Sequence, residues 1–254
     1  MNQKLNEKLA IVTGSHGSIG QAICLKLNQM GYDVLGIDNK KNLSTSDPSH
    51  FIQLDLKEIA KNSTEWQIAL TSIKDWIGSR HLRLLVNNAA LQIVEKTEAI
   101  SRESWKDTFD VNLTAPFFLS QELIGLFCKS EGSIINISSI HARLTKPNFV
   151  AYATSKAALS GMTRAMAVDL GNRLRVNSIE PAAIHTSMLE AGFDDELTET
   201  MINEIASFHP QNKIGKPEEV AALVYALADG DFKFLHGACV DMSGGISSRL
   251  HDPE

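Results

Sequence analysis

The chain has 254 residues, of which 43% are hydrophobic and 21% are charged, and its formal net charge is -6. This length and composition are typical of one large globular α/β domain or two small domains. The acidic balance argues against nucleic-acid and membrane-surface partners, which need basic patches. The three cysteines are far apart and form no CxxC pair, and the polar N-terminus lacks the apolar core of a signal peptide. We therefore expect a protein of a reducing, cytoplasmic compartment.

Short apolar runs alternate with helical patterns along the chain. Seven such runs predict strands centred on residues 9–12, 32–38, 51–54, 82–86, 133–138, 175–179 and 238–242. Amphipathic periodicity predicts helices over about 18–30, 64–78, 101–129, 152–171 and 217–228. This alternation indicates a parallel sheet with helices on both faces. Because no linker or internal repeat interrupts it, we expect a single domain over 1–254.

One stretch breaks this alternation. The residues between Pro181 and Pro217 contain no predicted strand, and their apolar side chains are spaced for amphipathic helices. Such an insertion often covers a binding site, so we expect a substrate lid at about 187–212. Its apolar face could instead be permanently buried or form an oligomer contact. The apolar residues are Met188, Leu189, Phe193, Leu197, Met201, Ile202, Ile205 and Phe208.

A glycine-rich turn follows the first predicted strand and leads into the first helix. Its sequence is Thr13-Gly14-Ser15-His16-Gly17-Ser18-Ile19-Gly20. The backbone N–H groups and the positive end of the helix dipole would face an anion, and the glycines permit its close approach. No Gly-Lys-Ser/Thr follows, which argues against a P-loop. The turn therefore predicts a dinucleotide pyrophosphate site, and a tight turn without a ligand is the alternative.

The second predicted strand ends at Asp38. A carboxylate there can bind the two ribose hydroxyls of the adenosine half and repels a 2′-phosphate, which favours NAD over NADP. Lys40 and Lys41 follow closely, and either could reach a phosphate. Asp38 could also be only a turn residue before Asn39.

A tyrosine and a lysine occur four residues apart on a predicted helix, as Tyr152 and Lys156. This spacing places them on one face. Lowering the tyrosine pKa from near 10 to ~7 requires about 4 kcal/mol of preference for the phenolate. A nearby ammonium and an oxidised nicotinamide could supply it, which would make Tyr152 a general acid/base. A surface Tyr–Lys pair is the alternative interpretation.

Two serines, Ser138 and Ser139, end the fifth predicted strand, at the edge where open α/β sheets bind ligands. A serine there could donate a hydrogen bond to a substrate oxygen. Both serines could instead cap a helix or a turn.

Together these motifs resemble the short-chain dehydrogenase/reductase family in its single-domain form, from about Leu9 to Gly245. The glycine turn is similar to TGxxxGIG, residues 87–90 to NNAG, and residues 177–182 to NxxxPG. The resemblance implies a Rossmann-like doubly wound sheet of seven parallel strands, hydride transfer with NAD(P), and a homotetramer or homodimer. It also implies the catalytic residues Asn112, Ser139, Tyr152 and Lys156.

The resemblance assigns a role to each of these residues. Tyr152 exchanges a proton with the substrate oxygen, and Lys156 holds the ribose and lowers the tyrosine pKa. Ser139 orients the substrate oxygen, and Asn112 supports a water that relays the proton from Lys156. The implied cofactor-binding residues are Gly14, Ser18, Ile19, Gly20, Asp38, Asp55, Leu56, Asn88, Ala89, Tyr152, Lys156, Pro181, Ile184 and Thr186.

Four positions depart from the family pattern. Ser18 replaces the middle glycine of the phosphate turn, Ala90 and Ala182 replace glycines, and Ser243 replaces an aspartate. Ser18 could weaken the approach of the pyrophosphate or shift the turn. The basic residue that favours NADP in the family would lie at Gly17 and is absent, which agrees with Asp38.

The sequence thus predicts an oxidoreductase that transfers a hydride between NAD(H) and a carbonyl or secondary alcohol. The expected substrate is small and polar: a sugar, a polyol or a hydroxy acid. Candidate substrate-binding residues are His141, Arg143, His185 and Met188. The alternatives are an NADPH-dependent ketone reductase that uses Lys40 or Lys41, and a non-catalytic nucleotide-binding sensor or scaffold. We expect no metal site.

Overall fold

The computed structural model describes residues 8–40, 48–190 and 198–250. Its strands form one seven-stranded sheet in the order β3-β2-β1-β4-β5-β6-β7, and every neighbouring pair is parallel. This confirms the doubly wound, Rossmann-like architecture. The strands are β1 (Lys8–Thr13), β2 (Tyr32–Asp38), β3 (His50–Gln53), β4 (Leu82–Asn87), β5 (Ser133–Ile137), β6 (Arg175–Pro181) and β7 (Cys239–Met242).

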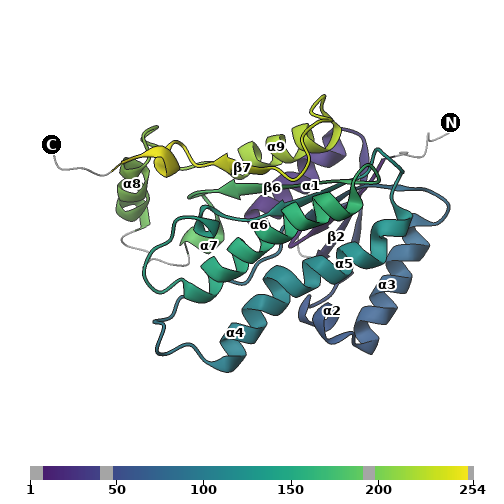
Figure 1. The fold of residues 1–254 in the computed structure, drawn as a ribbon, viewed down its shortest axis with the longest axis horizontal. Coiled ribbons are helices and arrows are strands. Elements are labelled where there is room, and N and C mark those ends of the chain that lie inside the picture. Colours follow the sequence, from purple (N-terminus) through teal and green to yellow (C-terminus); the bar gives the residue numbers. More distant parts are fainter. Residues whose placement is uncertain (1–7, 41–47, 191–197, 251–254) are drawn as a thin grey trace.

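Helices cover both faces of this sheet (Figure 1). The strands alternate their side chains between the faces, so Ala10 and Val12 of β1 lie in one apolar cluster while Leu9 and Ile11 lie in the other. The first cluster packs against α1 (Ser18–Gln29) and α9 (Pro217–Asp229). The second packs against α3 (Thr64–Ile77), α5 (Ala115–Leu123) and α6 (Val150–Leu170).

The long helix predicted over 101–129 is interrupted. It consists of α4 (Arg102–Phe109), a π-helical turn (Asp110–Thr114), α5 and a short 3₁₀ turn (Ile124–Leu126). Pro116 supplies the physical reason, because it lacks the N–H that would bond the carbonyl of Asn112 in a regular α-helix. The short helix α2 (Lys57–Lys61) was not predicted from the sequence.

The insertion after β6 contains α7 (Ser187–Glu190) and α8 (Thr198–Phe208). Residues 191–197, which include Phe193 and Leu197, lie outside the described residues. The end of α8 is tied to the C-terminal segment, because Arg249 Nη1 donates to the carbonyl of Phe208 at 3.1 Å. That this insertion covers a substrate stays a prediction.

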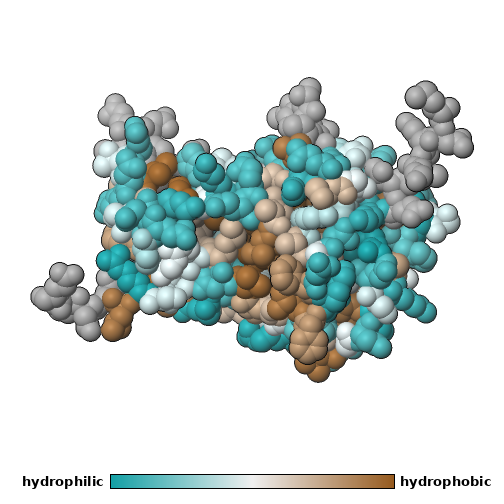
Figure 2. All heavy atoms as spheres, turned by 90° about the horizontal axis from the view of Figure 1, so that it is seen from above, coloured by the Kyte–Doolittle hydropathy of each residue, from teal (hydrophilic) through white to brown (hydrophobic). Residues whose placement is uncertain are grey.

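The surface seen from above α9 and β7 carries a band of apolar residues between more hydrophilic ends (Figure 2). Within the described ranges, no helix combines the length and the apolar character needed to cross a membrane.

Candidate active site

The glycine turn between β1 and α1 is closely packed against the segment after β4 and against itself. Gly14 has φ +65°, and a Cβ there would lie 2.7 Å from the Cα of Ala89. A Cβ on Gly20 would overlap the carbonyl of Gly14. Gly17, the N-cap of α1, makes no side-chain capping bond. The start of α1 therefore fits a pyrophosphate, because its backbone N–H groups are not capped by a side chain.

The turn is held against the end of β4. Thr13 Oγ1 accepts the backbone N–H groups of Asn88 at 3.0 Å and Ala89 at 3.1 Å. In return, Asn88 Nδ2 donates to the carbonyls of Thr13 at 3.0 Å and Gly14 at 3.1 Å. β1 and β4 adjoin where the strand order reverses, which is where doubly wound sheets bind their ligands.

Asp38 ends β2 beside this turn and is 8% exposed. Its Oδ2 accepts the backbone N–H of His16 and its Oδ1 accepts that of Lys40, both at 3.0 Å. These bonds hold the Asp38 carboxylate in place next to the glycine turn. Lys40, the residue that could instead bind a 2′-phosphate, is exposed. Lys41 lies outside the described residues.

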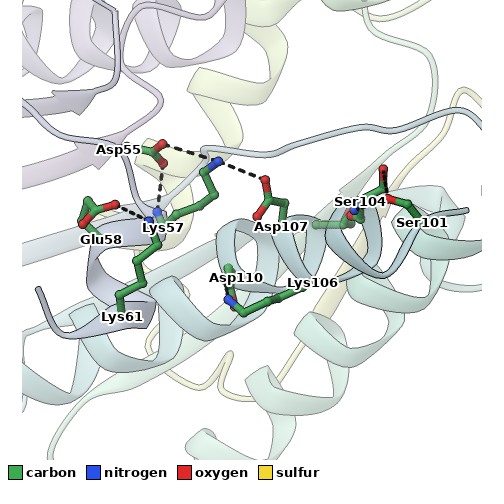
Figure 3. A network of polar contacts seen from close by, with 10 residues as sticks. Asp55, Lys57, Glu58, Lys61, Ser101, Ser104, Lys106, Asp107 and Asp110 are labelled. Atoms are coloured by element: carbon green, nitrogen blue, oxygen red, sulfur yellow. Dashed lines mark hydrogen bonds and ion pairs between the residues drawn. The ribbon is translucent and has the colours of Figure 1, made fainter.

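Asp55 follows β3 and orders the start of α2 (Figure 3). Its Oδ1 accepts the backbone N–H of Lys57 at 2.9 Å, while Lys57 Nζ donates to Asp107 Oδ2 on α4 at 3.0 Å. The hydrogen bond with Asp107 is the main reason why the pKa of Lys57 is raised. Leu56 is buried in the core. A role for Asp55 and Leu56 in binding adenine stays a prediction.

The end of β5 and one face of α6 bring together three of the four predicted catalytic residues. Tyr152 and Lys156, one helical turn apart on α6, are 8% and 2% exposed. Ser139, just beyond β5, is hydrogen-bonded to Tyr152 and accepts the backbone N–H of His141 at 3.2 Å. Lys156 Nζ lies 5.7 Å from the centre of the Tyr152 ring. Tyr152 and Lys156 therefore share one buried face, as their spacing predicts.

Burial dominates the electrostatics of this cluster. It raises the pKa of Tyr152 to about 12, and the hydrogen bond with Ser139 opposes this rise. It lowers the pKa of Lys156 to about 7. Lys156 Nζ donates to the carbonyl of Ile137 at 2.8 Å. In the chain alone, loss of hydration therefore sets the direction of the tyrosine pKa shift. That Lys156 and an oxidised nicotinamide together lower this pKa stays a prediction.

Asn112, in the π-helical turn, is fully buried and ties the segment after β4 to α6. Its Oδ1 accepts the N–H of Leu91 at 2.7 Å, and its Nδ2 donates to the carbonyl of Leu91 and to Ser155 Oγ, both at 2.9 Å. Ser155 is the neighbour of Lys156, so Asn112 supports the helix that carries the lysine. A water relay at Asn112 stays a prediction.

His141 lies directly beside the tyrosine. Its ring stacks on Phe149 at 4.7 Å between centroids and meets the Tyr152 ring edge-on at 5.7 Å. Its Nδ1 lies 2.9 Å from Thr145 Oγ1. Burial, and secondarily the charge of Lys146, lowers the pKa of His141 to about 4. The ring is therefore a neutral hydrogen-bonding group at neutral pH.

The guanidinium of Arg143 forms ion pairs with two carboxylates. Its Nε lies 2.7 Å from Glu180 Oε2 and its Nη2 lies 3.1 Å from Asp241 Oδ2. Glu180, on β6, is 1% exposed and also accepts the hydroxyl of Ser160 at 2.8 Å. Sequence analysis missed Glu180, although a carboxylate between the sixth predicted strand and Pro181 was a signal for it. Arg143 thus presents a compensated charge rather than a free cation.

The segment after β6 approaches the glycine turn from the other side. Ile184 is buried and forms an isolated bridge with Gly215. Thr186 Oγ1 accepts the N–H of Leu189 at 3.2 Å and so caps α7. His185 is exposed and Met188 is 46% exposed, and their contact with a substrate stays a prediction.

Two further departures from the family pattern, Ala182 and Ser243, lie near the ends of β6 and β7. The N–H of Ala182 donates to the carbonyl of Met242 at 3.0 Å. Ser243 Oγ lies 2.8 Å from Ser247 Oγ.

The fold and this cluster of side chains define a dinucleotide-dependent oxidoreductase. The family model described as enoyl-(acyl carrier protein) reductase matches residues 14–247. The chain belongs to the short-chain dehydrogenase/reductase family, whose members are NAD(P)-dependent oxidoreductases acting on CH–OH groups.

Three known proteins illustrate the range of this family. The chain is 29% identical to a cyclohexanol dehydrogenase from Acinetobacter sp. (strain SE19), over 98% of each chain. The ligand-free structure of an aldohexose dehydrogenase from Thermoplasma acidophilum is 32% identical, with a TM-score of 0.87 and coverage of 97% of each chain. A 4-hydroxyisoleucine dehydrogenase complexed with NADH is 28% identical, with a TM-score of 0.82 and coverage of 96% of this chain and 100% of that one.

Proposed function

We propose that this protein is an NAD-dependent dehydrogenase of a small, polar secondary alcohol, with a sugar or polyol as the best-fitting substrate class. The observation that carries this proposal is the buried contact between Ser139 and Tyr152, with Lys156 one helical turn away. A non-catalytic scaffold gains nothing from burying a lysine whose pKa is thereby lowered to about 7.

The chemistry follows from what each side chain can do. Ser139 and the Tyr152 hydroxyl hold the substrate oxygen, and Tyr152 takes its proton as the alcohol is oxidised. A bound, oxidised nicotinamide would supply the hydride acceptor and a positive charge that favours the phenolate. Lys156 can exchange a proton near neutral pH because burial brings its pKa to about 7.

Two observations favour a neutral polyhydroxy substrate over a hydroxy acid. His141 is a neutral hydrogen-bonding group beside the Tyr152 ring, which suits a second substrate hydroxyl. Arg143 is already paired with Glu180 and Asp241, so it offers little attraction to a substrate carboxylate. The similar aldohexose dehydrogenase agrees with this choice.

The direct test is to incubate the purified chain with NAD⁺ and a panel of aldoses, polyols, cyclohexanol and hydroxy acids. We expect formation of reduced cofactor, fastest with a neutral polyhydroxy compound. Faster turnover of hydroxy acids would overturn the substrate class. Binding of NAD without turnover of any compound would favour the sensor alternative.

Asp38 is proposed to set the preference for NAD over NADP. Changing Asp38 to asparagine removes the charge and keeps an acceptor oxygen for one of the two N–H groups, those of His16 and Lys40, that the carboxylate accepts. We expect the ratio of NADPH to NADH dissociation constants to fall by about 10- to 100-fold, because one less unit charge repels the 2′-phosphate. Fluorescence titration with both cofactors measures this ratio.

The matched control is Asp55→Asn, which removes a carboxylate that lies beyond β3 and orders α2. It should leave the ratio unchanged. An equal fall in both variants would show that net charge, rather than the position of Asp38, determines the preference.

We further propose that the protein is a homotetramer or homodimer. The band of apolar residues seen from above α9 and β7 supports this (Figure 2), because exposed apolar bands commonly mark interfaces.

A further inference from the structure

Ser18 occupies the position where the family pattern has a glycine, and its side chain reaches a distant segment. Ser18 Oγ accepts the backbone N–H of Ser187 at 3.2 Å and lies 3.4 Å from Ser187 Oγ. Ser18 opens α1 and Ser187 opens α7. The hydroxyl thus bridges the phosphate turn and the segment after β6.

This bridge lies between the two parts of the chain that the cofactor has to contact. On one side is the start of α1, which no side chain caps. On the other side is Thr186, predicted to hold the nicotinamide and adjacent to Ser187. The Cβ of Ser18 therefore does not simply add bulk at the turn, because its hydroxyl connects both sides.

A serine hydroxyl can accept one hydrogen bond and donate another at the same time. The N–H of Ser187 uses an acceptor lone pair of Ser18 Oγ, and this bond increases the polarity of the hydroxyl proton. A hydrogen bond to a charged phosphate oxygen is stronger than one between neutral groups.

We infer that Ser18 is a cofactor-positioning residue, whose hydroxyl accepts the N–H of Ser187 and donates its own proton to a phosphate oxygen of the dinucleotide. Ser18 then couples cofactor binding to the docking of α7, so restoring the family glycine weakens binding. This inference rests on the proposed function, because it requires that the chain binds NAD(H).

The test compares Ser18→Gly and Ser18→Ala with the wild-type chain by fluorescence titration with NADH. Both variants should raise the dissociation constant by about tenfold, since each loses one charge-assisted hydrogen bond. Ser187→Ala is the control, because it keeps the backbone N–H that Ser18 accepts, and its dissociation constant should stay within about twofold of wild type.

A second measurement needs no cofactor. Amide hydrogen exchange at Ser187 in the free protein should be several-fold faster in both Ser18 variants, because the acceptor of that N–H is gone. Equal or tighter NADH binding by Ser18→Gly, or unchanged exchange at Ser187, would refute the inference. If the wild-type chain bound neither NADH nor NADPH, the proposed function would fail, while the exchange measurement would still decide whether Ser18 holds α7.

Discussion

Changing Tyr152 to phenylalanine is expected to lower kcat by about 10³-fold, within the 10²- to 10⁴-fold range that a positioned general acid or base supplies. The substitution removes only the hydroxyl that contacts Ser139. The ring keeps its edge-on contacts with His141 and Phe149, so the fold should be unaffected. Steady-state kinetics with the best alcohol of the panel measures the loss.

The control for this variant is Tyr225→Phe on α9, which removes a hydroxyl from the opposite face of the sheet. It should retain wild-type kcat. NADH affinity of Tyr152→Phe should stay within a few-fold of wild type, because the glycine turn, which the substitution leaves intact, is the proposed site of the cofactor phosphates. A kcat near that of the wild type would remove Tyr152 from the reaction.

Changing Lys156 to methionine is expected to abolish turnover but to stabilise the fold by about 2–4 kcal/mol at neutral pH. Burial lowers the pKa of Lys156 from its ordinary 10.5 to about 7. This difference corresponds to about 5 kcal/mol of penalty against the charged form, an upper bound for what the substitution can recover. The lost hydrogen bond from Nζ to the carbonyl of Ile137 offsets part of that gain.

Lys156 also affects how the free energy of unfolding varies with pH. Between about pH 7 and 10 the unfolded lysine keeps its proton while the folded one releases it, so wild-type stability should rise with pH. Below about pH 7 both states are protonated and this contribution is constant. Above about pH 10 the raised pKa of Tyr152 acts in the opposite sense, because only the unfolded tyrosine ionises there.

Urea unfolding at about pH 6 and about pH 9 checks this prediction. Lys156→Met should lack the rise in stability, while Lys129→Met, which changes an exposed lysine, should keep it. Parallel pH profiles for the wild-type chain and Lys156→Met would mean that Lys156 titrates as an ordinary lysine.

The strands and the placement of Tyr152 and Lys156 on one face of α6 could be predicted from the sequence, because both depend on local periodicity. Buried parallel strands read as continuous apolar runs, and a separation of four residues places Tyr152 beside Lys156 on any helix. The π-helical turn at 110–114 left no such trace, because the missing N–H of Pro116 changes the hydrogen bonds but not the spacing of apolar residues.

Interactions between segments that are distant in the chain could not be predicted from the sequence. The partnership of Arg143 with Glu180 and Asp241 joins the end of β5 to β6 and β7, and only the folded sheet places these charges together. The raised pKa of Tyr152 likewise follows from how completely the fold removes water from it.

Glu180 also constrains how this enzyme could diverge. Its carboxylate is buried between Arg143 and Ser160, so losing the charge of Arg143 alone would leave a buried carboxylate without its ion-pair partner. Substitutions at the two positions should therefore be strongly non-additive. Lineages that acquire a different substrate range should exchange both residues together, and libraries that vary only Arg143 should return mainly poorly folded clones.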